Sequence, residues 1–192
     1  ATVTFIVNPV NDAPLAQNNS YSINEDESIT TANIITDSDT VAGADSDIDS
    51  ASLTVESYLI AGMAGTQTVG TAVVIPTVGT LTILANGSLT FIPLANYNGT
   101  VPNILYTITD GEGTSIANVV ITVNPVNNAP VAQNNAYSVN EDASITTANI
   151  ITDTDAVAGT DSDIDSASLT VQSYTIAGIT GTQTVGAAVG IP

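Results

Sequence analysis

The feature that most constrains the fold is an internal repeat. Residues 8–39, NPVNDAPLAQNNSYSINEDESITTANIITDSD, return at 124–155 as NPVNNAPVAQNNAYSVNEDASITTANIITDTD. The offset is 124 − 8 = 116 residues, and it holds without a gap to the last residue, with roughly three quarters of the overlapping positions identical. A period of this length is too long for one turn of a solenoid and suits a self-contained domain. We therefore expect a tandem array of separate domains.

The register of the repeat predicts three segments. Residues 1–7, ATVTFIV, align with 117–123, ANVVITV, and are expected to be the last strand of a preceding repeat. Residues 8–123 are expected to form a complete repeat, and residues 124–192 the N-terminal two thirds of the next one. The sequence is thus interpreted as a window on a longer array.

Within the complete repeat the apolar pattern is that of β-strands. Apolar residues alternate with a period of two in ANVVITV and in NILYTIT (103–109), and no segment has helical periodicity. Asn86-Gly87 favours a type I′ hairpin turn, in which both residues have positive φ. Residues 61–77, rich in Gly and Thr, are expected to be a long connection or an extra edge hairpin. We predict a seven-stranded, all-β sandwich with strands near 19–23, 28–36, 52–60, 79–85, 88–93, 103–109 and 115–123.

The charge composition limits the possible partners. The chain carries 19 carboxylates and no Lys, Arg or His, which gives a net charge of −19, yet 43% of its residues are hydrophobic. This hydrophobic fraction is much higher than in disordered acidic tails, so the chain is expected to fold. Phosphate recognition relies on Lys and Arg, so nucleic acid is not an expected partner, and anionic membrane surfaces are disfavoured for the same reason. No apolar run is long enough to span a membrane, so we expect no membrane insertion.

The same composition argues against an enzyme. Without His, Cys or Lys, the Ser–His, Cys–His and Schiff-base routes are closed, and so are intramolecular isopeptide bonds, which need Lys. A carboxylate pair of the glycosidase kind remains. However, six Tyr, two Phe and no Trp supply little of the aromatic platform that a sugar cleft usually has. We expect no catalytic activity.

The strand order predicts where the carboxylates gather. The chain reverses at each turn of a sandwich, so alternate loops lie at the same end. Glu25 and Asp26 follow the first strand and should lie at one end. The acidic loop 37–49 and the turn with Asp110 and Glu112 should lie at the other, beside the incoming linker NPVNDAP. Carboxylates are therefore expected to flank both linkers.

The acidic loop has the residue types of a calcium site. Ca²⁺ takes six to eight oxygen ligands at about 2.3–2.6 Å, and in an extended stretch Asp45, Asp47 and Asp49 point the same way. An EF-hand is rejected, because Ser50 stands where its Gly is needed and SLTV after it reads as a strand. The alternative is that these carboxylates are solvated charge, with Glu25-Asp26 capping a turn and Asp110–Glu112 supplying turn chemistry only.

Several motifs together resemble a known family. VNDAP at a domain start, NED after the first strand, the Asp-x-Asp runs, GTLTILANGSLTFIPLANYNGT and YTITDGEGT are similar to the cadherin-like tandem repeats of giant bacterial surface proteins. These include RTX-type adhesins and the gliding-motility adhesins of Bacteroidetes. The resemblance implies a Greek-key sandwich, export to the extracellular cell surface, and Ca²⁺ at interdomain joints.

By the logic of that family, carboxylates of one repeat face the linker and the acidic loop of the next. The second linker carries Asn128 where the first has Asp12, so the two joints are expected to differ in affinity. The candidate metal ligands are Asp12, Glu25, Asp26, Asp37, Asp39, Asp45, Asp47, Asp49, Asp110, Glu112, Asn127, Asn128, Glu141, Asp142, Asp153, Asp155, Asp161, Asp163 and Asp165.

The function that we predict is that of a structural spacer. It would be one segment of a long extracellular repeat adhesin or filament, stiffened by Ca²⁺ at its joints and supporting cell-surface adhesion or motility. Its expected partners are neighbouring repeats of the same chain, with surface glycans or other filament chains as further possibilities. The alternative is a carbohydrate- or ice-binding module that uses Thr-rich strands such as GTLTIL (79–84).

Overall fold

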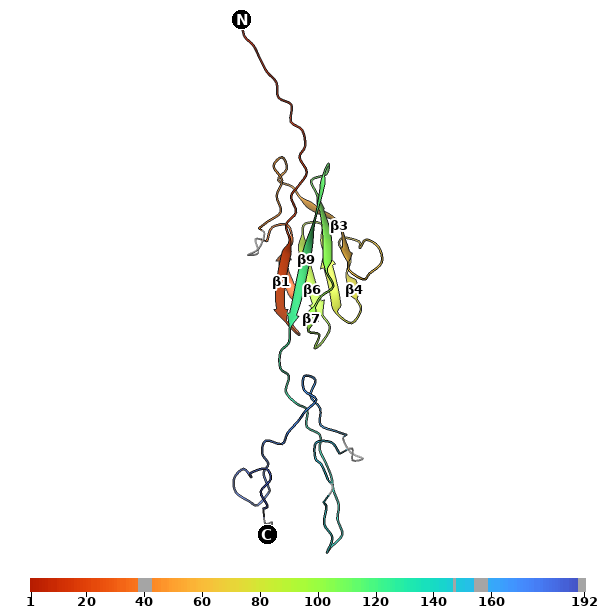
Figure 1. Cartoon of the computed structure of the whole chain (residues 1–192), viewed down its shortest axis with the longest axis vertical. Coiled ribbons are helices and arrows are strands. Elements are labelled where there is room, and N and C mark those ends of the chain that lie inside the picture. Colours follow the sequence, from red (N-terminus) through yellow and green to blue (C-terminus); the bar gives the residue numbers. More distant parts are fainter. Residues whose placement is uncertain (38–42, 147, 154–158, 190–192) are drawn as a thin grey trace. The chain divides into compact units, whose positions relative to one another are not determined.

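The computed structural model describes residues 1–37, 43–146, 148–153 and 159–189 (Figure 1). The chain divides into two compact units, Ala1–Val126 and Asn127–Pro192. Each unit is described by itself below.

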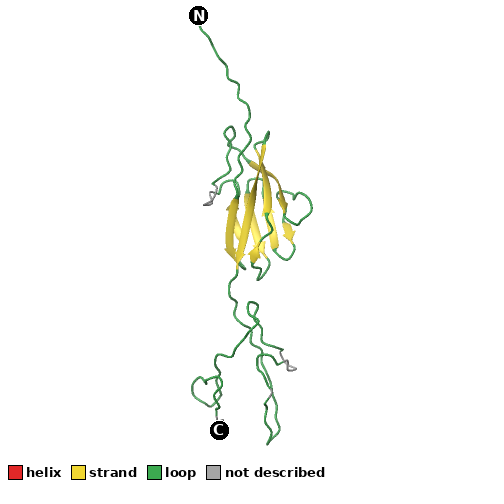
Figure 2. Ribbon diagram, viewed as in Figure 1, coloured by secondary structure: helices red, strands yellow, loops and turns green. Residues whose placement is uncertain are grey.

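The first unit is a β-sandwich of two sheets, with no helix among its described residues (Figure 2). One sheet has the order β1-β9-β8-β3, with β7 paired to β9, and the other has the order β2-β6-β5-β4. The chain passes from one sheet to the other and back, as in a Greek key. The strands are β1 (Asn19–Asn24), β2 (Ile29–Asn33), β3 (Thr54–Ile60), β4 (Val73–Ile75), β5 (Gly79–Ile83), β6 (Ser88–Pro93), β7 (Gly99–Thr100), β8 (Ile104–Thr109) and β9 (Thr114–Asn124). The predicted all-β sandwich is confirmed.

Two features of the sandwich differ from the prediction. Its described residues form nine strands rather than seven. The two additional strands, β4 and β7, form ladders of only three and two residues, too short to show an apolar alternation. Of the two expectations for residues 61–77, the edge hairpin is the one found, since β4 pairs with β5. The type I′ turn is also wrong: at this turn only Gly87 has a positive φ, of 85°, and Gly87 N–H donates to Leu84 O at 3.0 Å. That is the pattern of a three-residue loop closed by a left-handed glycine.

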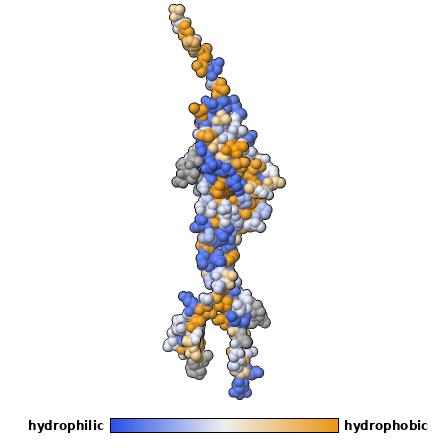
Figure 3. Space-filling view, viewed as in Figure 1, coloured by the Kyte–Doolittle hydropathy of each residue, from blue (hydrophilic) through white to orange (hydrophobic). Residues whose placement is uncertain are grey.

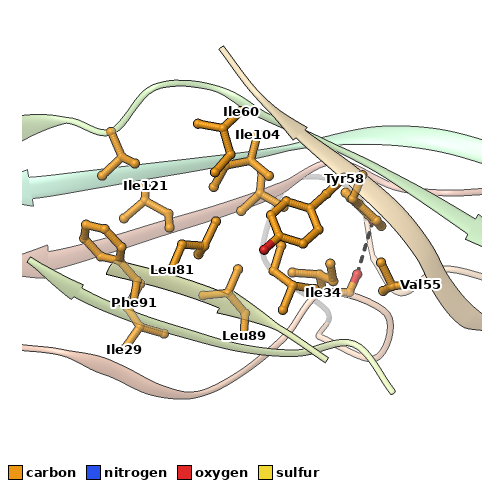
Figure 4. Close-up of a cluster of buried hydrophobic side chains, with 14 of the residues drawn as sticks. Ile29, Ile34, Val55, Tyr58, Ile60, Leu81, Leu89, Phe91, Ile104 and Ile121 are labelled. Atoms are coloured by element: carbon orange, nitrogen blue, oxygen red, sulfur yellow. Dashed lines mark hydrogen bonds between the residues drawn. The ribbon is translucent and has the colours of Figure 1, made fainter. Parts of the chain in front are cut away.

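The core lies between the sheets and is apolar (Figure 4). Alternate residues of each strand point inward, so Leu81 and Phe91 of one sheet and Ile104 and Ile121 of the other are fully buried. Two tyrosines, Tyr58 on β3 and Tyr106 on β8, are paired directly across the strands and are buried as well.

The outer faces of the sheets carry almost no charge. Among the strand residues Glu56 is the only carboxylate, and it lies at a register shift of β3. On the outer face of the β2-β6-β5-β4 sheet, Val74 pairs with Thr80 and Thr80 with Ile92, so hydroxyl and apolar side chains share one row. Figure 3 shows hydrophobic residues on the flank of the first unit. This row is thus interrupted by apolar side chains, whereas the next row on the same face pairs Thr82 with Thr90.

The second unit repeats local contacts of the first. Its described residues contain no strand, but an isolated bridge joins Val131 to Ser162, as Leu15 joins Ser46 in the first unit. These contacts therefore depend on the local sequence more than on the sheets.

Candidate metal centre

The incoming linker and two acidic segments meet at one end of the sandwich. Asp12 N–H donates to Asp49 Oδ2 at 2.8 Å, and Asn11 Nδ2 donates to Asp110 Oδ2 at 2.9 Å. The linker is also held by a bridge in which Leu15 and Ser46 exchange backbone hydrogen bonds of 2.7 and 3.1 Å. This clustering agrees with the end that the strand order predicts for the acidic loop and for the turn at Asp110.

The outgoing linker is held by Glu25. Although it is a carboxylate, Glu25 is only 4% exposed. Its Oε1 accepts from Val126 N–H at 2.5 Å, and its Oε2 accepts from Asn98 Nδ2 at 3.2 Å. The next residue, Asp26, has a φ of 63° and accepts a hydrogen bond from Asn96 N–H at 3.0 Å. Glu25 thus joins the end of β1 to the first residues after β9.

Asp45 points from the acidic loop into the sandwich. Its Oδ1 accepts from Gln17 N–H at 2.6 Å, and its two oxygens lie 3.0 and 3.1 Å from the Tyr106 hydroxyl. Asn19, also buried, donates to the same hydroxyl from Nδ2 at 3.1 Å. Burial raises the pKa of Asp45 to about 6, against the lowering effect of the hydrogen bonds from Gln17 and Tyr106.

Asp47 closes a turn instead of continuing an extended strand. Its Oδ1 accepts from Asp49 N–H and from Ser50 N–H, both at 2.7 Å. The expectation that Asp45, Asp47 and Asp49 point the same way in an extended stretch is therefore wrong, because an aspartate can bond the backbone two residues on and bend the chain. The second oxygen of Asp47, Oδ2, is buried and has no hydrogen-bond partner among the described residues.

Two further carboxylates stabilise turns. Asp37 Oδ2 accepts from Asn33 N–H at 2.7 Å and from the Tyr21 hydroxyl at 3.0 Å. Asp110 Oδ1 accepts from Gly113 N–H at 2.6 Å and from Glu112 N–H at 2.8 Å. The Gly113 hydrogen bond, followed by those from Glu112 and Asn11, lowers the pKa of Asp110 to about 2. Glu112 itself is exposed.

The second unit reproduces the contacts of the incoming linker and of the acidic loop. Asn128 N–H donates to Asp165 Oδ2 at 2.5 Å, as Asp12 does to Asp49. The donor is the backbone, so the exchange of Asp12 for Asn128 leaves this bond intact. Gln133 N–H donates to Asp161 Oδ1 at 2.7 Å, as Gln17 does to Asp45.

The remaining candidates of the second unit also occupy turns or linkers. Asp163 Oδ1 accepts from Asp165 N–H at 2.8 Å, and Asp153 Oδ2 accepts from the Tyr137 hydroxyl at 2.9 Å. Asn127 Nδ2 donates to Asn128 O at 2.7 Å. Glu141 and Asp142 are exposed, with a φ of 63° at Asp142. Asp39 and Asp155 lie outside the described residues.

These carboxylates suit a hard cation in their chemistry, but not as a preformed cage. All the candidate ligands are oxygen donors, and the buried Asp47 Oδ2 is an oxygen that a cation would satisfy. In the described part of the chain, however, no three acidic side chains lie close enough together to hold one metal ion. Within each unit they instead accept hydrogen bonds from the linkers, from turns and from tyrosine hydroxyls.

Sequence reasoning missed the buried polar contacts beside the acidic loop. Asn19, Gln17 and Tyr106 were not recognised as partners of Asp45. A signal was present at Tyr106, which shares the inward face of its strand with Ile104 and Ile108. A tyrosine at such a position usually needs a partner for its hydroxyl.

The first unit is a Greek-key sandwich whose acidic loops bind its own linkers. These two features are typical of the cadherin-like class of β-sandwich modules. The sequence profile of the bacterial cadherin-like domain matches residues 11–125, and the chain belongs to that family. None of the curated proteins matches the chain. Cadherin-like domains generally bind Ca²⁺, are typically non-catalytic, and are typical of extracellular or surface proteins. In the part of the chain that the structure describes, no helix is long and apolar enough to cross a membrane.

Proposed function

We propose that this chain is a spacer segment of a long extracellular repeat adhesin or filament, stiffened by Ca²⁺ at its interdomain joints. It would support cell-surface adhesion or motility without contacting a ligand of its own. The observation that carries the proposal is that carboxylates hold the linkers at both ends of the first unit, through Asp49 and Asp110 at one and Glu25 at the other.

The strand directions support a spacer. The first strand, β1, runs parallel to the last, β9, so the chain enters the sandwich at one end and leaves it at the other. Each domain of this kind adds its length to the array. The expected partners are the neighbouring repeats.

The charge distribution supports a role for Ca²⁺. The chain has no basic side chain, so nothing in it compensates the carboxylates that gather at its linkers. The carboxylates nearest the incoming linker are Asp12, Asp49 and Asp110, and those nearest the outgoing linker are Glu25 and Asp26; they would have to draw closer together to share one ion. A bound Ca²⁺ would supply the missing positive charge. At a concentration tenfold above its dissociation constant, each ion would stabilise the fold by about 1.4 kcal/mol.

A thermal melt of the full chain in EDTA and across a Ca²⁺ titration tests this proposal, with small-angle scattering on the same samples. We expect the melting temperature to rise with Ca²⁺, to rise less with Mg²⁺, and the particle to lengthen. An unchanged melt and scattering curve would leave the carboxylates as solvated charge and turn caps.

Two variants locate the effect. Asp49→Asn should weaken the response to Ca²⁺, because it removes a carboxylate beside the incoming linker. Glu56→Gln is the control, since Glu56 lies on a strand and in neither a linker nor an acidic loop, and its counterpart in the second repeat is already Gln172. Equal Ca²⁺ responses in the two variants would contradict an ion at the joint.

A further inference from the structure

The first and last strands of the first unit lie side by side in a continuous parallel ladder. Its register runs from Asn19 opposite Val119 to Asn24 opposite Asn124, without a shift. β1 is the strand that the incoming linker leads into, and β9 is the strand that the outgoing linker leaves. The two strands that connect this unit to the rest of the chain are therefore bonded directly to each other.

Hydrogen bonds extend this ladder at both ends. Before it begins, Asn118 N–H donates to Asn18 Oδ1 at 2.9 Å. Beyond its last pair, Glu25 N–H donates to Asn124 O at 2.8 Å, and Glu25 Oε1 accepts from Val126 N–H at 2.5 Å. The contact thus continues into the outgoing linker, and the side chain of a buried carboxylate makes its last bond.

The direction of the strands decides how this contact would respond to tension. A pull on the two linkers draws β1 toward the incoming end and β9 toward the outgoing end. The two forces are opposite and parallel to the strands, whereas the ladder bonds lie across them. Such a pull loads all the ladder bonds together. A pull that separates the two strands from one end would instead break them one at a time.

The hydrogen bonds that hold the incoming linker resist tension less well than the ladder does. Besides the two backbone hydrogen bonds of the Leu15–Ser46 bridge, Asp49 and Asp110 each bind the linker with one exposed hydrogen bond, to Asp12 and Asn11, ahead of the ladder. Tension on the incoming linker meets these exposed bonds first and can release them while the sheets remain intact. The ladder between β1 and β9 is the contact that must fail before the sandwich opens.

We propose that the β1–β9 ladder, extended by Glu25, is the mechanical clamp of this domain, the contact that resists unfolding when the two linkers are pulled apart. Its use in the organism rests on the proposed spacer function, because only a segment under tension needs a clamp. The clamp itself needs no metal ion. An experiment in EDTA can therefore support or overturn it whatever the Ca²⁺ titration shows.

Single-molecule force spectroscopy on the full chain tests the clamp. The chain has no cysteine, so two introduced cysteines give unique attachment points. The pair Asn8→Cys and Asn127→Cys pulls β1 and β9 in opposite directions along the strands. The pair Asn8→Cys and Glu112→Cys pulls at the shared starting end of the same two strands and peels them apart. We expect the first pair to need at least about twice the rupture force of the second at equal loading rate, because forced unfolding is governed by the unfolding rate along the pulled direction. Equal forces would overturn the proposal.

A second comparison isolates Glu25. With the Asn8 and Asn127 handles, Glu25→Gln should lower the rupture force, because a neutral amide oxygen accepts the Val126 N–H more weakly than a carboxylate does. Glu141→Gln is the matched control, since Glu141 is the counterpart of Glu25 in the second unit and lies outside the pulled segment. An unchanged force for Glu25→Gln would remove Glu25 from the clamp. If that variant does not fold, the comparison of the two pulling directions in the unaltered sandwich still decides the proposal.

Discussion

The two buried tyrosines of the core make a sharp test of the energetics of this sandwich. Tyr58 and Tyr106 are directly opposite each other on β3 and β8, and each is at most 1% exposed. The Tyr106 hydroxyl lies 2.6 Å from Gln17 O and 3.0 Å from Asp45 Oδ1. The Tyr58 hydroxyl has no hydrogen-bond partner among the described residues. The pKa of both is raised, chiefly because burial disfavours the phenolate.

We expect Tyr58→Phe to stabilise the first unit. A buried polar group without a partner costs about 1–3 kcal/mol, which the substitution recovers. The small void left by the missing oxygen atom reduces that gain by a few tenths of a kcal/mol. The net expectation is a free energy of unfolding higher by about 1 kcal/mol, which raises the melting temperature of a domain of this size by roughly 4 °C.

Tyr106→Phe is the matched comparison and should act in the opposite direction. It removes the hydroxyl that lies against the buried Asp45 carboxylate and accepts a hydrogen bond from the Asn19 amide. The free energy of unfolding should therefore fall by about 2–4 kcal/mol. Urea denaturation followed by circular dichroism, at pH 7 in EDTA, measures both values. A loss of 1 kcal/mol or more in Tyr58→Phe would refute the reasoning, because it would mean that the Tyr58 hydroxyl is hydrogen-bonded in solution, for example to a buried water.

Three further predictions concern the backbone and the pH dependence of the first unit. Thr77→Gly should stabilise it by about 0.5–1 kcal/mol in the same denaturation assay, because Thr77, a β-branched residue, has a φ of 63°; a loss of stability would show that the turn is not strained. Gly79→Ala should destabilise it by about 3 kcal/mol or more, because the added Cβ would lie 2.4 Å from Ile92 O; a normal melt would contradict this close approach. Finally, the folded pKa of Asp45, about 6, lies above its ordinary 3.8, so folding favours its protonated form. Its contribution to stability is complete below about pH 4 and declines as the pH rises from there through 6. Denaturation in EDTA from pH 4 to pH 7 should show this decline, and it should be absent in Asp45→Asn.

Strands β5, β6, β8 and β9 were predictable from the sequence because buried and less buried residues alternate along them. Ile104, Tyr106 and Ile108 were correctly assigned to one face, and that face is buried. β4 and β7 were not predictable, since they are strands only because a neighbouring strand pairs with them. The end of the sandwich to which each acidic loop belongs followed from counting chain reversals, which needs no side-chain detail.

The individual carboxylates were less predictable than their location. Asp45, Asp47 and Asp49 are indistinguishable as letters at two-residue spacing, but the structure gives them different environments. Asp45 is buried against Tyr106, Asp47 closes a turn, and Asp49 holds the linker. Which aspartate turns inward depends on where Gln17 and Tyr106 come to lie, and those positions are set by strands distant in the sequence. The assignment of these residues to Ca²⁺ stays a prediction.

The arrangement in which the chain enters and leaves the sandwich at opposite ends also stores length. The longest strand, β9, has 11 residues and spans about 36 Å at about 3.3 Å per residue. The 116-residue repeat, offset 124 − 8, would reach about 390 Å if fully extended at about 3.4 Å per residue. One domain that unfolds under a sudden pull would thus lengthen the chain by many times the folded domain's own length. The tension on the neighbouring domains would then fall. If the chain is the proposed spacer, a repeat that opens would in this way limit the force on the rest of the chain.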